Sequence, residues 1–214
     1  MEPNREAKAA RGRKLFGFYS AILSAAFYLL FDVAAVAGMS GSIKDPFVVS
    51  LAWYGPSLLL TYSYLGMVAA LYQDELCQNR LYILCALAVG LIYVTLNSMT
   101  YVIQVALIAP SFLNYTFANV SVFEMASGKP LYAVNGLAYT LMGFSTLFLS
   151  LSMRRRSSGN AMKTVLFLHG VVAPSVFCAL FLNEAFFVSS TIAITYPASA
   201  FLIARYFWKS RKES

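Results

Sequence analysis

Five polar or ionisable side chains lie within or between long apolar stretches of this sequence. They are Asp32, Asn97, Gln104, Asn135 and Glu184. Such side chains are costly in a hydrocarbon environment, so each is a candidate for substrate binding. Helix directions place all five toward one side of a membrane, where two carboxylates with few cations would favour a cation, an amine or a proton. The structural alternative is that Asp32 hydrogen-bonds to a neighbouring helix and Glu184 is solvated at a turn.

His169 is the only histidine and is expected toward the opposite, cytoplasmic side of its helix. An imidazole gains or loses a proton near neutral pH, so a proton relay is one interpretation and hydrogen-bonded packing is the other. One histidine cannot form a His-rich metal site. The cysteines at positions 77, 85 and 178 show no metal-ligand spacing. The sequence therefore predicts no metal, no cofactor and no structural disulfide.

Several enzyme motifs are missing. The sequence has no HExxH zinc motif, no phosphate-binding loop and no GxSxG nucleophile elbow. No lysine lies deep in an apolar stretch, which argues against a retinal Schiff base. These absences favour a protein that is not an enzyme, although they leave acid–base chemistry by Asp32, Glu184 or His169 open.

Six apolar stretches must position these residues. The chain is 59% hydrophobic and only 12% charged, well outside the range of soluble domains. A helix crosses a bilayer with about 20 apolar residues and satisfies its own backbone hydrogen bonds there. The predicted fold is an all-α integral membrane protein, a compact bundle of six transmembrane helices over 15–208 with basic tails at 1–14 and 209–214. The predicted spans are 15–38, 47–72, 81–110, 131–153, 165–183 and 186–207.

Basic residues cluster in segments that six membrane crossings would place on one side of the bilayer. Formal net charge is +7, and the clusters are the N-terminal tail, the loop at 154–156 and the C-terminal tail. The other side holds only Lys44 and Lys129. The positive-inside rule then predicts that both termini are cytoplasmic, in a bacterial inner or plasma membrane. These charges match lipid headgroups as partners, and no nucleic-acid surface is expected.

Proline occurs within three of the predicted spans, at Pro56, Pro174 and Pro197. Each removes a helical hydrogen bond and is expected to kink its helix. Pro56 and Pro174 occupy matching positions if the chain consists of two inverted three-helix halves, a plan that many transporters use. The alternative is coincidence, because proline is common in membrane helices and the halves show no residue-by-residue similarity.

The longest connection, 111–130, is too apolar for an ordinary solvated loop. It is interpreted as an interfacial cap, with a movable lid as the alternative. Its Asn114 and Asn119 begin glycosylation sequons, which matter only in a secretory pathway. Tyrosines within the spans need hydroxyl partners and either pack or line a cavity for an organic cation or a lipid. They include Tyr62, Tyr64, Tyr93, Tyr101 and Tyr139.

Three functions follow from these features. The first is a small transporter or permease-like protein whose outward-facing cleft surrounds Asp32 and takes a cation, an amine or a proton-coupled solute. The second is a membrane-embedded enzyme acting on a lipid or isoprenoid. The third is a non-catalytic membrane subunit or sensor. No motif points to a particular family, and the oligomeric state is left open.

Overall fold

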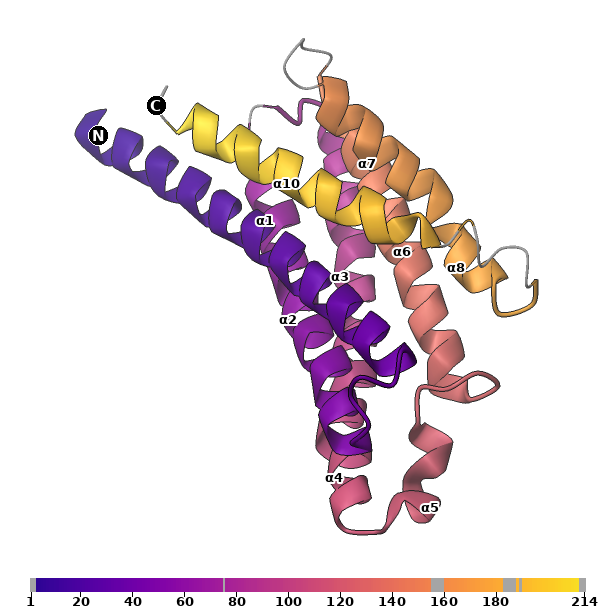
Figure 1. Cartoon of the computed structure of the whole chain (residues 1–214). Helices are drawn as coiled ribbons and strands as arrows, with labels where there is room; N and C mark the ends of the chain where they lie inside the picture. The colour runs from indigo at the N-terminus through magenta and orange to yellow at the C-terminus, as the bar shows by residue number, and fades with distance from the viewer. Residues whose placement is uncertain (1–2, 75, 155–159, 183–187, 189, 212–214) are drawn as a thin grey trace.

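Helices account for all the long elements of the described chain, as the computed structural model shows in Figure 1. The structure describes residues 3–74, 76–154, 160–182, 188 and 190–211. Within these residues the only β-type pairing is an isolated bridge between Cys77 and Met153. The expected all-helical class is therefore confirmed.

The long helices are α1, α2, α3, α6, α7 and α10, and α3 and α7 each have an extension. A π-helical turn, Gln104–Ile108, joins α3 to α4, and Ala173 separates α7 from α8. A short helix, α5, and a 3₁₀ turn, Ser121–Phe123, lie in the long connection. The bounds are α1 Pro3–Met39, α2 Pro46–Tyr72, α3 Arg80–Ile103, α4 Ala109–Leu113, α5 Phe117–Val120, α6 Pro130–Ser152, α7 Asn160–Val172, α8 Pro174–Cys178 and α10 Ile192–Ser210.

Four of the described helical segments are long and apolar enough to cross a membrane. They are Lys8–Met39, Arg80–Leu113, Pro130–Ser152 and Asn160–Cys178. The other two predicted spans correspond to α2 and α10, which are not among these four segments. Much of the polarity of α2 faces the protein, because Ser57, Thr61 and Tyr64 are buried. These four helices support the expected membrane protein. Six membrane crossings are part of the proposed function.

Local sequence explains where several helices begin. The Asp45 carboxylate accepts hydrogen bonds from the amides of Phe47 and Val48, and Pro46 occupies the first turn of α2. Asn79 caps α3 in the same way by accepting from the amide of Tyr82. Such caps satisfy the free amides of a first turn, where proline costs nothing.

Several element boundaries differ from the sequence-based expectation. The segment expected as a separate tail, 1–14, continues α1 from Pro3. The expected fifth span, 165–183, is divided instead into α7 and α8 because Pro174 begins a new short helix. Pro56 and Pro197 remain inside the continuous helices α2 and α10.

The six long helices form a closed ring. Each packs against two neighbours in the order α1, α2, α3, α6, α7, α10, and α10 returns to α1. Helices α1 and α6 therefore face each other across the centre. Figure 1 shows α1 and α10 crossing the upper part of the molecule, with the N- and C-termini close together.

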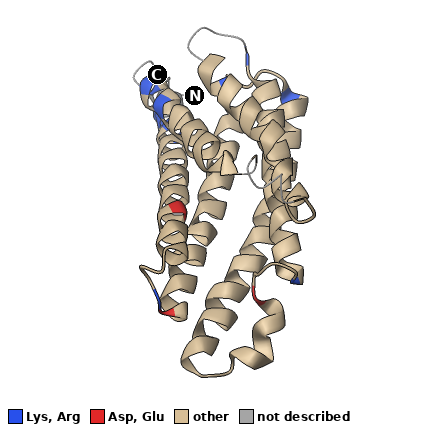
Figure 2. Ribbon diagram, turned by 45° about the vertical axis from the view of Figure 1, so that its right-hand side comes forward, with Lys and Arg blue, Asp and Glu red and all other residues tan. Residues whose placement is uncertain are grey.

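The ring has two distinct ends. The basic end holds both termini and the described part of the 153–160 connection, and Figure 2 shows most of the blue Lys and Arg segments there. The distal end holds the turn after α1 and the connection from α4 to α6. Its two described basic residues are Lys44 and Lys129.

Helices α6 and α7 cross most closely through a pair of glycines. A Cβ atom placed on Gly143 would lie 2.2 Å from Cβ of Ala173, and one on Gly170 would lie 2.8 Å from the carbonyl oxygen of Gly143. Small residues let two helix backbones approach in this way and exchange close van der Waals contacts. This crossing fixes the position of Ala173, where α7 gives way to α8.

We expect Gly143→Ala to destabilise the protein, because the added methyl group collides with Ala173. The thermal midpoint in detergent should fall by about 2–10 °C, as overpacking costs about 1–3 kcal/mol. The measurement is the loss of the monodisperse chromatographic peak with temperature. Gly55→Ala is the matched control, since nothing lies within 4 Å of its added Cβ. Equal midpoints for the two variants would show that the crossing is looser than described.

Candidate functional site

Asp32 lines a cavity of about 310 Å³ in the distal half of the ring. The cavity lies between α1 and α6, and the start of α10 and the segment after α8 complete its walls. Asn135 comes from α6, on the wall opposite Asp32. Because α1 and α6 face each other across the ring, this cavity occupies the ring interior.

The Asp32 carboxylate has no hydrogen bond and no ion pair with any described residue. The one ion pair of the described chain joins Lys129 to Glu124, with 2.6 Å between Nζ and Oε2. Asp32 is partly exposed, so its carboxylate is accessible from the cavity. An unpaired carboxylate among apolar groups is unfavourable unless a cation or a hydrogen-bond donor meets it.

A second acceptor in the same cavity also has no partner. The Oδ1 atom of Asn135 is buried and accepts no hydrogen bond from the described part of the chain. Tyr28, Tyr132 and Tyr139 also line the cavity. The cavity therefore offers a carboxylate acceptor among aromatic side chains, and no described lysine or arginine lines it.

Seven buried tyrosines continue from this cavity through the ring, and we call them the tyrosine column. They are Tyr28, Tyr54, Tyr64, Tyr93, Tyr101, Tyr139 and Tyr196. Ring centroids are 4.9 Å apart between Tyr28 and Tyr196 and 5.2 Å apart between Tyr64 and Tyr93. Such spacing is typical of aromatic pairs that attract one another. Five of the six long helices contribute to the column.

The hydroxyl groups of the column mostly bond within the ring. Tyr101 and Tyr139 share a hydrogen bond of 3.0 Å between their hydroxyl oxygens. Tyr64 donates to Ser145 Oγ at 2.6 Å, and Ser145 donates to the carbonyl oxygen of Ala86 at the same distance. The column thus ties helices α2, α3 and α6 together through polar contacts.

Asn97 lies in the column and not in the cavity. It is fully buried on α3, and neither its Nδ2 nor its Oδ1 has a hydrogen-bond partner among the described residues. The same is true of the Tyr93 hydroxyl, one helical turn away. Asn97 therefore belongs to the ring interior at a level that Asp32 does not reach directly.

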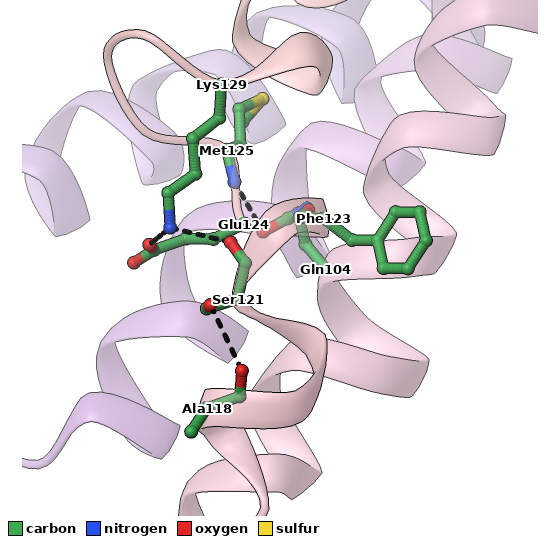
Figure 3. A network of polar contacts seen from close by, with 7 residues as sticks. All are labelled: Gln104, Ala118, Ser121, Phe123, Glu124, Met125 and Lys129. Atoms are coloured by element: carbon green, nitrogen blue, oxygen red, sulfur yellow. Dashed lines mark hydrogen bonds and ion pairs between the residues drawn. The ribbon is translucent and has the colours of Figure 1, made fainter.

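Gln104 is bound to the long distal connection, as Figure 3 shows. Its Nε2 donates to the carbonyl oxygen of Phe123 at 2.7 Å, and its Oε1 accepts from the amide of Met125 at 3.1 Å. Lys129 Nζ adds a hydrogen bond of 2.6 Å to the carbonyl oxygen of Ser121. Both polar atoms of the Gln104 side-chain amide form hydrogen bonds to this connection. The side chain therefore holds the connection in place and does not line the Asp32 cavity. This arrangement resembles the expected cap more than a free lid.

His169 is fully buried on α7. Its Nδ1 lies 3.1 Å from Thr195 Oγ1, and its ring centroid lies 5.3 Å from that of Tyr196. Its Nε2 has no partner among the described residues. The imidazole therefore extends the column onto α7, the one long helix that supplies no tyrosine to it.

Of the five predicted binding residues, the structure brings Asp32 and Asn135 together. Asn97 and Gln104 lie elsewhere, and Glu184 falls outside the described residues. Sequence reasoning did not identify Tyr28, Tyr54 and Tyr196 as members of one column. Tyr62 was grouped with the column residues but is 54% exposed on the outer face of α2. Helical periodicity could have separated it from Tyr64, because residues two positions apart on a helix point about 200° apart, toward opposite faces.

The basic end of the ring is closed by polar contacts. Tyr206 on α10 donates to Asp74 Oδ1 at 2.5 Å. The backbone amide of Arg154 donates to the carbonyl oxygen of Leu76 at 3.0 Å, which links the end of α6 to the connection between α2 and α3. Lys14 Nζ donates to the carbonyl oxygen of Ser210 at 2.9 Å. We call these three contacts the basic-end closure.

The described residues contain no group of three or more His, Cys, Asp or Glu side chains that could hold a metal ion. The site and the fold together define an all-helical chain with four helices suited to a membrane. Comparison with protein-family models, with curated proteins and with solved structures finds no match. Function must therefore be argued from the cavity, the column and the closure.

Cys77 provides a test of the basic-end closure. Burial raises the pKa of its thiol to about 11, because a thiolate loses hydration there. At pH 7.5 only about three thiols in 10,000 are then ionised, and only the thiolate reacts with maleimides. We expect alkylation in the folded protein to accelerate about tenfold per pH unit from 7.5 to 10.

The matched control is Gln78→Cys in a Cys77→Ser background, because residue 78 is exposed. Its alkylation should level off near pH 9, as for an ordinary thiol. A plateau at the same pH for Cys77 would show that this connection is open to solvent.

Proposed function

We propose that this chain is a small permease-like carrier whose cavity around Asp32 faces outward and binds a positively charged or proton-carrying solute. The observation that carries the proposal is the unpaired Asp32 carboxylate inside a cavity of the ring. A carboxylate in a membrane-embedded ring is expensive to keep, so an ionisable group without a partner favours ligand binding.

Six crossings give the ring a consistent membrane arrangement. Helix α2 has 27 residues and α10 has 19, so at 1.5 Å per residue they span about 40 Å and about 28 Å. Both lengths suit a bilayer core of about 30 Å. Six crossings put the basic end in the cytoplasm with both termini, by the positive-inside rule. The Asp32 cavity then lies toward the outer leaflet.

The ring order is compatible with two inverted halves. Helices α1, α2 and α3 are consecutive neighbours, as are α6, α7 and α10. The halves meet through α3 with α6 and through α10 with α1, which a two-fold axis would exchange. Pro56 in α2 and Pro174 after α7 fall on the matching second helices. An inverted repeat lets a carrier expose one site to either side in turn.

A difference between the two ends also supports a carrier. The distal half holds the cavity, whereas the basic-end closure joins α1, α10, the α2–α3 connection and the end of α6. A carrier caught facing outward has this asymmetry. A membrane enzyme receives less support, because Asp32 is the only described acidic or histidine side chain that lines the cavity. No specific observation favours a structural subunit.

The carrier proposal predicts that opening the basic end closes the distal end, so accessibility at the two ends should change in opposite directions. Ala193 lines the cavity, so Ala193→Cys in a background lacking Cys85 and Cys178 adds a distal reporter to native Cys77. Tyr206→Phe removes one contact of the closure, a hydrogen bond to a carboxylate of the kind that contributes about 1.5–3 kcal/mol. Asp74 keeps its hydrogen bond from the amide of Leu76. We expect faster labelling of Cys77 and slower labelling of residue 193 by an impermeant maleimide in oriented vesicles.

Tyr19→Phe is the control, because Tyr19 is exposed on α1 and the substitution is the same. It should change neither rate. Labelling of residue 193 from the cytoplasmic side alone would contradict the orientation. Faster labelling of Cys77 with no change at residue 193 would contradict alternating access.

A further inference from the structure

We propose that the Asp32 cavity is a binding site for a primary amine that carries an aromatic or similarly flat apolar group. The inference rests on the proposed function only in taking Asp32 as the group that meets the solute. It specifies the ligand chemistry, which the carrier proposal leaves open.

The charge of the cavity selects a cation. Asp32 is the one described carboxylic acid in its walls, no described basic residue lines it, and no described residue pairs with the carboxylate. An anion would be repelled by this carboxylate in a poorly hydrated site. A neutral ligand would leave the charge uncompensated, at a free-energy cost that a cation removes.

The hydrogen-bonding pattern selects an ammonium group. The cavity presents the two carboxylate oxygens of Asp32 as acceptors. A primary ammonium carries three N–H donors and no acceptor, so one head group can serve both oxygens. A quaternary ammonium has no donor and would leave the carboxylate without a hydrogen bond. A divalent metal ion needs six or more oxygen ligands, more than this pair supplies.

The remaining walls select the body of the ligand. Tyr28, Phe31 and Tyr139 offer aromatic faces, and Val176, Leu180 and Ile192 are apolar. A cation over a tyrosine ring gains about 0.5–2 kcal/mol, and a flat apolar group buries its surface against such walls. The volume of about 310 Å³ equals about ten water molecules at liquid density. A ligand of about ten non-hydrogen atoms therefore fits.

The experiment measures binding of 2-phenylethylamine to the full chain in nanodiscs of zwitterionic lipid, by isothermal titration calorimetry. Two probes of nearly the same shape are compared with it: 2-phenylethanol, which is neutral, and 3-phenylpropionate, which is anionic. We expect the amine to bind at least tenfold more tightly than the alcohol, and the acid to give no detectable heat. Equal affinities for the amine and the alcohol would overturn the proposal.

Variants then assign the binding to this cavity. Asp32→Asn keeps the shape and removes the charge, so the amine should lose at least tenfold in affinity while the alcohol is little affected. Asp45→Asn is the matched control. It makes the same chemical change at the distal end, and asparagine caps a helix as well as aspartate does. Unchanged amine affinity in Asp32→Asn would overturn the site.

Val176→Trp tests the site independently, in case Asp32→Asn does not fold. It fills the cavity from α8 and leaves the carboxylate intact, so amine binding should again be lost if the cavity is the site. Retained binding in this variant would place the amine elsewhere and overturn the proposal. Amine binding that follows all these expectations, without reciprocal labelling of Cys77 and residue 193, would support the amine site and reject the carrier. Reciprocal labelling without amine selectivity would support the carrier and reject the amine site.

Discussion

Polar groups placed in hydrocarbon must find their partners inside the protein, and this requirement shapes the whole ring. A tyrosine hydroxyl that faces lipid toward the bilayer centre leaves a donor and an acceptor unsatisfied, whereas one that faces the ring interior can bond to another helix. The hydrogen bonds from Tyr64 to Ser145 and between Tyr101 and Tyr139 do this across helices that are far apart in sequence. The polar residues Ser57 and Thr61 of α2 follow the same rule, because both are buried inside the protein.

The column also explains why the cavity lies where it does. Tyr28 and Tyr139 belong both to the column and to the cavity wall, so the packed interior ends where Asp32 and Asn135 begin. Each ring of the column contacts another ring or a hydroxyl partner. The Asp32 carboxylate, by contrast, borders the open volume of the cavity. Asn97, Tyr93 and His169 also have polar atoms without partners among the described residues, but those atoms lie in the packed interior. Asp32 lies where a solute can reach it, and this accessibility is the physical basis of the binding proposal.

Composition and the lengths of the apolar stretches were enough to predict the helical class and the approximate position of each long helix. Charge placement predicted an end rich in Lys and Arg, which the fold places beside both termini. The candidate site was predicted only in part. Asp32 and Asn135 line the same cavity, but Gln104 is engaged by the backbone of Phe123 and Met125. This contact spans about twenty residues of chain, and no sequence pattern encodes it. Asn97 is separated from Asp32 because the depth of a residue in a helix does not say which way the helix faces.

The sequence by itself determined that this chain forms long apolar helices, because hydrocarbon leaves the backbone no other way to satisfy its hydrogen bonds over such stretches. It also determined where the scarce charges lie along the chain. The tertiary structure alone decided the order of helices in the ring, and with it the meeting of α1 and α6 across the interior. That order depends on close contacts such as Gly143 against Ala173 and on hydroxyl pairs between distant helices. Such contacts are set by the relative rotation of packed helices, which local sequence does not specify.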